Sequence, residues 1–291
     1  MKRVVTVGLD GSPESLAAAR WAADEAERRG LTLRLLHAWP LLAPEPVRVP
    51  SEIDQNYWAK RLVHNAQAEL QTYHPGLTVV GDLVADDARH ALLQAASESE
   101  MTVLGSRGLE LLESYFMGDI SMPVVAHAER PVVLVRAMKD KEGRPPAPLA
   151  TGRVVVALKL HGPCDDLLEF SFRAAAAHGV PLRAVHGRSL PLHSHASGGV
   201  DHDITEEIRQ DAREHLNQAL RPWHEKYPRV EVADSVHLES PAKAVVGAAE
   251  GAGLLVVGRR RHHPVLGPLL GPVTQAALHH ARCPVAVVPH D

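Results

Sequence analysis

The chain has 291 residues, of which 45% are hydrophobic and 23% charged, enough apolar material for one large domain or two of typical size. This composition excludes global disorder, and a net charge of −4 gives no reason to expect broad binding to nucleic acid or to an anionic membrane. No stretch approaches the roughly twenty apolar residues that span a bilayer, and Cys164 and Cys283 lie in no disulfide or zinc-site pattern, so we expect a cytoplasmic protein.

Apolar runs of strand length alternate with segments of helical period in the first half of the chain. The predicted strands cover residues 4–9, 32–39, 78–84, 101–105 and 131–136. The first run is short and lacks a small-residue cleavage site, which favours a buried strand over a signal peptide. An apolar stripe through residues 16–26 predicts a helix with Ser12 as its N-cap and Pro13 in its first turn. A second stripe covers residues 88–96.

The second half of the chain repeats the first. VLGSRGLELLESYFMGDISMPVVAHAERPVVLVR (103–136) returns as VVGRRRHHPVLGPLLGPVTQAALHHARCPVAVVP (256–289), with matching positions 153 residues apart. Near the start of each half the separation is 149 residues, as between Gly30 and Gly179, which places a small insertion in the second half at the loop HSHASGGVDHD. The predicted strands are 153–158, 181–187, 230–238, 254–258 and 284–288, and a helical stripe runs through 204–219.

This alternation predicts βαβ units around a parallel sheet in each half. We therefore expect two tandem α/β domains, each a doubly wound five-stranded parallel sheet, over residues 1–137 and 153–291. The segment 138–152 between them is rich in Pro, Gly and charge, which is typical of a linker. Sheets of this kind bind ligands beyond the carboxyl ends of their strands, where the strand order reverses.

Two motifs of the first half carry candidate chemistry. They are Asp10-Gly11-Ser12 after the first strand, and Gly105-Ser106-Arg107-Gly108 followed by Gly118-Asp119-Ile120-Ser121 at the start of a helix. If the first and fourth strands flank the reversal point, Asp10 and Gly105 meet at one edge of the sheet. Glycines let a ligand approach the backbone, and free N–H groups at a helix start favour an anion, so the pattern indicates phosphate binding. A lone G-x-x-G is a weak signal, because glycine also serves ordinary turns.

The order of the motifs is more specific than any one of them. Gly105 and Gly108 form a G-x-x-G motif, Gly118 follows after nine further residues, and Ser121 comes after it. This spacing resembles the nucleotide loop of the universal stress protein family. Three further segments are similar to that family: the strand end Asp10-Gly11-Ser12, the strand end His37-Ala38-Trp39 and the run 131–135. The resemblance extends over both halves of the chain. It implies an adenine nucleotide alpha hydrolase-like fold that binds ATP between the first and fourth strands.

The resemblance also implies which residues contact the nucleotide. They are Asp10, Gly11, Ser12, Ala38, Gly105, Ser106, Arg107, Gly108, Gly118, Asp119, Ile120 and Ser121. Asp10 would approach the adenosine and ribose, the Ala38 backbone would hold adenine, and the glycine loop would line the phosphates. One position departs from the family: Asp119 stands where Ser or Thr is usual. A carboxylate there caps its helix well, but it repels phosphate or contacts it only through Mg²⁺.

The second half departs further from the family pattern. Lys159 stands at the position of Asp10, Arg261 at that of Gly108, and Pro272, which has no backbone N–H, at that of Asp119. The run 259–263 is cationic and is interpreted as a solvated basic loop in preference to an anion site. We expect a degenerate second site.

Other polar groups are interpreted as structural. Asp86 and Asp87 precede a predicted helix and are expected to cap it. His37 and His186, at matching strand ends, are expected to be partly buried fold residues. The histidines of segment 193–203 lie among Ser and Gly, and a mobile polar loop is favoured over a metal site.

The sequence therefore predicts a stress-response regulator that binds ATP through its first domain, with little or no catalysis, since no P-loop lysine or general base is visible. The terminal strands 132–135 and 285–288 should lie at sheet edges; in relatives this strand forms the dimer contact, which implies an internal pseudo-dimer and a homodimer. The protein partner is unknown. Two alternatives stay open: an interaction protein that binds no nucleotide, and a slow ATP hydrolase.

Overall fold

A computed structural model describes residues 3–39, 51–106, 120–137, 152–160, 162–189, 195–196, 199–200, 202–261 and 270–291. The chain divides into two units, Met1–Pro148 and Leu149–Asp291. Almost all of the predicted linker lies outside the described residues.

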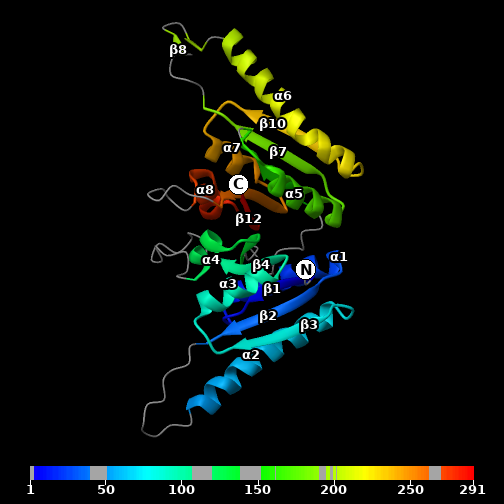
Figure 1. Ribbon diagram of the computed structural model, residues 1–291, viewed down its shortest axis with the longest axis vertical. Helices are drawn as coiled ribbons and strands as arrows, with labels where there is room; N and C mark the ends of the chain where they lie inside the picture. Colours follow the sequence, from blue (N-terminus) through cyan, green and yellow to red (C-terminus); the bar gives the residue numbers. More distant parts are fainter. Residues whose placement is uncertain are drawn as a thin grey trace. The chain divides into compact units, whose positions relative to one another are not determined.

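Unit 1 alternates strands and helices. In chain order its elements are β1 (Val4–Gly8), α1 (Pro13–Arg29), β2 (Thr32–Ala38), α2 (Ser51–Tyr73), β3 (Val79–Val84), α3 (Ala88–Glu98), β4 (Met101–Ser106), α4 (Ser121–His127) and β5 (Val132–Arg136) (Figure 1). The strands pair in parallel in the order β5-β4-β1-β2-β3. The order reverses between β1 and β4, which confirms the predicted doubly wound, five-stranded sheet.

Unit 2 has the same architecture. Its elements are β6 (Val154–Ala157), α5 (Asp165–His178), β7 (Leu182–Gly187), β8 (His195–Ala196), β9 (Gly199–Val200), α6 (His202–Lys226), β10 (Val232–His237), α7 (Pro241–Ala248), β11 (Leu254–Arg260), α8 (Pro272–His280) and β12 (Val285–His290). Five strands pair in parallel in the order β10-β7-β6-β11-β12, and the reversal lies between β6 and β11.

The strands are apolar because helices cover both faces of each sheet. In unit 1, α1 packs beside α2 and α3 beside α4, as right-handed crossovers require when the chain winds first one way from β1 and then the other. Val5 and Val7 of β1 are fully buried, as is Val103 of β4. A strand covered on both faces reads as a continuous hydrophobic run and not as an alternating one, which explains the pattern in the sequence.

Helix α1 has clear signals at both ends. Ser12 is its N-cap, and the Ser12 hydroxyl accepts a hydrogen bond from the Ser15 N–H at 3.1 Å, as predicted. Gly30 ends the helix with φ +60°, a left-handed conformation that glycine adopts without strain, and its N–H bonds back to the last turn. The position of Gly30 recurs in unit 2 as Gly179, which closes α5 with φ +63°.

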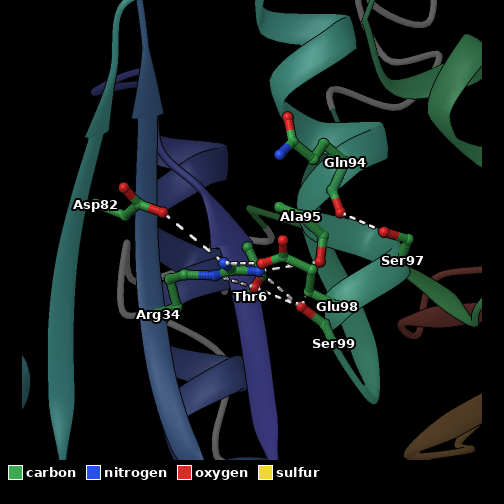
Figure 2. Close-up of polar contacts among 8 residues, drawn as sticks. All are labelled: Thr6, Arg34, Asp82, Gln94, Ala95, Ser97, Glu98 and Ser99. Atoms are coloured by element: carbon green, nitrogen blue, oxygen red, sulfur yellow. Dashed lines mark hydrogen bonds and ion pairs between the residues drawn. The ribbon is translucent and has the colours of Figure 1, made fainter. Parts of the chain in front are cut away.

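On the α3 face of unit 1, Arg34 joins three strands to a helix. Its guanidinium donates to Thr6 Oγ1 at 2.9 Å, to the Ala95 carbonyl at 3.0 Å and to Glu98 at 3.0 Å. Ser99 Oγ accepts a further bond at 3.1 Å, and Figure 2 shows Asp82 of β3 on the opposite side of the guanidinium. These contacts tie the end of α3 to β1 and β2, so they fix the entry into β4.

Two segments differ from the sequence prediction. Segment 193–203 was expected to be a polar loop, yet β8 and β9 pair in antiparallel fashion, and His202 and Asp203 belong to α6. Helix α2, with 23 residues, is absent from the predicted elements.

Candidate strand-end site

The predicted meeting of the first and fourth strands is present in unit 1. The register pairs Val5 with Met101 and Val7 with Val103, and both strands run the same way. Their carboxyl ends, which lead into Asp10 and Gly105, therefore lie at the same edge of the sheet, at the point where the strand order reverses. This is the position at which doubly wound sheets bind ligands.

A short hydrogen-bonded turn fixes Asp10. The carboxylate oxygen Oδ1 accepts from the Ser12 N–H at 2.9 Å and from the Ser12 hydroxyl at 2.5 Å. Between them Gly11 has φ +84°, which a residue with a side chain rarely adopts. Because the Ser12 hydroxyl also caps α1, the helix start and the exposed Asp10 carboxylate are held by one set of bonds.

Gly105 is needed for packing, independently of any ligand. A Cβ at this position would lie 2.6 Å from the Glu14 carbonyl carbon and 2.7 Å from the Ser15 nitrogen. Backbone atoms of α1 cannot move away as a flexible side chain can. The first turn of α1 therefore rests directly on the end of β4, and this contact brings the Asp10 turn to the Gly105 edge.

The hydroxyls that follow Gly105 differ in their partners. Ser106 is 5% exposed, and its Oγ has no hydrogen-bond partner among the described residues. A buried hydroxyl without a partner is costly, and the segment that follows Ser106 lies outside the described residues. Ser121 instead donates to the Gly105 carbonyl at 3.4 Å, and Ile120 beside it is 41% exposed. The predicted site residues Arg107, Gly108, Gly118 and Asp119 lie outside the described residues.

Strand β2 adds a histidine to the same edge. His37 Nδ1 lies 2.7 Å from the carbonyl oxygen of Leu9, which can only accept, so Nδ1 carries the proton. The His37 ring stacks on Trp39, with 6.3 Å between centroids, and Ala38 between them is partly exposed. His186 makes the equivalent bond in unit 2, at 2.9 Å to Leu158. The histidines hold neighbouring strand ends together, in line with the structural interpretation.

Of the two aspartates predicted to cap α3, Asp87 does so and Asp86 does not. Asp87 is the N-cap of α3 and accepts from the Arg89 and His90 N–H groups at 3.0 and 3.1 Å. Asp86 accepts from His90 Nδ1 at 2.5 Å. The hydrogen bond from His90, followed by that from the Asp87 N–H, lowers the pKa of Asp86, and the same bond to Asp86 raises the pKa of His90.

The corresponding edge of unit 2 lacks the first helical turn. At the separation of 149 residues Pro13 corresponds to Gly162, yet α5 begins only at Asp165. Its N-cap is Cys164, which makes no side-chain capping bond, and burial together with Asp165 raises the pKa of the Cys164 thiol. Lys159, at the position of Asp10, is exposed. The turn that holds a carboxylate in unit 1 is therefore missing.

The space beside Gly258 is filled by another part of the chain. A Cβ on Gly258, the counterpart of Gly105, would lie 2.6 Å from His290 Nε2, so the imidazole takes the place of the α1 backbone. Arg261 folds back onto Asp166 at 2.8 Å and Asp291 at 3.5 Å. In unit 2 the side chains of His290 and Arg261 thus lie at the edge that corresponds to the Asp10–Gly105 edge of unit 1.

Arg259 was expected to be part of a solvated basic loop, and this is wrong. It is 6% exposed, and burial, with the charge of Arg261 second, lowers the pKa of its guanidinium. The prediction failed because Arg259 is the penultimate residue of β11 and still points into packed structure. Sequence reasoning also missed the roles of Ser15 and His290, since neither belongs to a recognisable motif.

The described residues give two further negative findings. None of the helices among them is long and apolar enough to cross a membrane. In the same part of the chain, no three His, Cys, Asp or Glu side chains are grouped so that they could hold a metal ion.

The strand orders define a tandem pair of doubly wound α/β domains, the first of which brings Asp10 and Gly105 to one edge of its sheet. Comparison with known proteins specifies the family: the universal stress protein family matches residues 1–136 and again residues 151–289. The chain belongs to this family, and the resemblance inferred from the motifs is confirmed.

Relatives match over both units. Universal stress protein Rv2005c of Mycobacterium tuberculosis is 31% identical over 97% of this chain and 96% of its own length. Universal stress protein Rv2623 of the same organism is 29% identical, with 97% and 95% covered. The crystal structure of a universal stress protein from Archaeoglobus fulgidus has the same fold, with a TM-score of 0.73, 18% identity and complete coverage of both chains.

Proposed function

We propose that this protein is a stress-response regulator that binds one ATP in unit 1 and none in unit 2. The observation that carries the proposal is the contrast between the two strand-end edges. In unit 1, Ser12 holds Asp10 at the edge of the sheet where β4 ends with the buried Ser106. In unit 2, His290 and Arg261 occupy the same edge.

The residues of unit 1 fit an adenine nucleotide. The Asp10 carboxylate accepts hydrogen bonds, as ribose hydroxyls require. Ser106 supplies a hydroxyl whose burial favours a bond to a ligand oxygen. The glycine loop would meet the phosphates, and Asp119 would hold Mg²⁺, whose positive charge would offset the repulsion between the carboxylate and the phosphates.

The output of binding in this proposal is a change of conformation or of protein partner, not a chemical product. ATP shifts the protein between two states only if it binds one of them more tightly. Little or no hydrolysis is expected, since the sequence has no P-loop lysine and no visible base to activate water. A slow hydrolase is the alternative, and single-turnover hydrolysis of bound ATP separates the two.

The test is calorimetric titration of nucleotide-stripped protein with ATP, with and without Mg²⁺. Saturable binding that requires Mg²⁺ and becomes independent of it in Asp119→Ser would support the assigned role of Asp119. If the parent binds no ATP but Asp119→Ser does, the aspartate has switched the site off. The protein then acts through protein contacts alone, which is the remaining alternative.

A further inference from the structure

Large apolar side chains are exposed to water mainly in unit 1. Among the described residues they are Tyr57, Trp58, Tyr73, Val80 and Ile120. Trp58 is 63% exposed and Tyr57 is 55% exposed, and both lie near the start of α2. Exposing a large ring to water is unfavourable, so this aromatic pair requires an explanation.

The chain direction places Trp58 at the same edge as the proposed nucleotide site. Helix α2 follows β2 and precedes β3, and it starts on the side of the sheet where these strands end (Figure 1). One turn after Trp58, the Leu62 side chain lies 3.3 Å from the position that a Cβ on Gly11 would take. Along the α2 axis Trp58 is about 6 Å from Leu62, toward the start of the helix.

The side of α2 that carries Trp58 faces α1. Residues four apart share one side of a helix, so Trp58 lies above Leu62. Glu69, seven residues after Leu62, is on this side too and bonds to Arg20 of α1 at 2.7 Å. Trp58 thus lies on the side of α2 that faces α1, near the start of α2, whereas Tyr73 is the last residue of the helix.

A positively charged side chain lies beside the Trp58 ring. The Arg61 guanidinium lies 5.6 Å from the centre of the Trp58 ring, within the range of a cation–π contact, and Tyr57 meets Trp58 edge to face at 5.9 Å. These contacts restrict the Trp58 rotamer and place a positive charge beside an exposed aromatic surface. A planar aromatic ligand that also bears negative charge complements both features.

We propose that Trp58 forms an aromatic wall against which the base of the nucleotide packs, with Arg61 favouring the anionic ligand. This inference rests on the proposed function, and it adds the side chain of α2 against which the base packs. An aromatic face that stacks on a base contributes about tenfold or more to affinity. Inorganic tripolyphosphate, which has no base, gains nothing from Trp58.

The experiment compares Trp58→Ala, Trp58→Phe and the control Tyr73→Ala in the full chain, after circular dichroism has shown that each is folded. Titrations with ATP and with tripolyphosphate give the dissociation constants. We expect Trp58→Ala to weaken ATP about tenfold, Trp58→Phe to retain most of the affinity, and neither to change tripolyphosphate binding. We also expect AMP to quench tryptophan fluorescence less in Trp58→Phe than in the parent.

Two results would overturn the inference, and they can be told apart. If the parent binds ATP and Trp58→Ala behaves like Tyr73→Ala, the aromatic wall is wrong while the proposed function stands. If the parent binds no ATP, both the proposed function and the role of Trp58 in packing against the base are refuted.

Discussion

Glu25 and Arg29 form an ion pair inside unit 1, one helical turn apart on α1, with exposures of 0% and 7%. Removing one member of such a pair leaves a charge without its counterion in a dry environment. We predict that Glu25→Ala lowers the free energy of unfolding by about 3–5 kcal/mol. The exposed pair between Arg20 and Glu69 is the control, and Arg20→Ala should cost less than about 1 kcal/mol. Urea denaturation measures both, and equal losses would contradict the prediction.

We predict that the exposed ion pair of Asp86 and His90 is detectable in the titration of both side chains. The pKa of His90 is raised above its ordinary value of 6.5. The contribution of His90 to the stability of the folded state is therefore complete below pH 6.5 and is lost as the pH rises through the raised pKa. The pKa of Asp86 is lowered below 3.8, so its contribution is present above 3.8 and is lost as the pH falls through the lowered value. NMR titration of His90 should give a lower pKa in Asp86→Asn than in the parent. An unchanged value would disprove the pairing.

At the scale of elements, the same glycine has different neighbours in the two units. Gly105 faces the α1 backbone, whereas Gly258 faces the end of the His290 side chain and Leu167. A side chain can rotate away and a helix backbone cannot. We predict that Gly105→Ala destabilises unit 1 by about 1–3 kcal/mol, as overpacking does, and that Gly258→Ala costs less. Thermal unfolding of the two variants provides the comparison, and a larger loss for Gly258→Ala would refute it.

The strands were predictable because parallel strands covered on both faces are continuous apolar runs. Helix α2 was missed although it carries the usual signal: its buried positions Ala59, Val63, Ala66 and Leu70 recur at i, i+4, i+7 and i+11. The short pairing of β8 with β9 joins two-residue strands, which leave no periodicity to detect.

The site was predictable in part. That Asp10 and Gly105 share an edge follows from the strand order alone. That His290 fills the space beside Gly258 does not, because it depends on the missing first turn of α5. Local motifs report which residue types are present, but they do not report which distant side chain occupies a gap.

At the scale of the whole molecule, duplication has produced two units with one fold and different strand-end edges. Unit 1 keeps the capped turn at Asp10, while unit 2 has a lysine there and closes the edge with Arg261 and His290. The strand orders place β5 and β12 last within their own units. The predicted docking of these strands and the homodimer remain predictions, which sedimentation of the full chain can test.

The number of ATP molecules bound per chain decides whether unit 1 alone binds nucleotide. Asp10→Asn and Lys159→Asn are a matched pair of variants at equivalent positions of the two units. We predict one ATP per chain, at least tenfold weaker binding in Asp10→Asn, and unchanged binding in Lys159→Asn. Two ATP molecules per chain, or a loss of affinity in Lys159→Asn but not in Asp10→Asn, would contradict it.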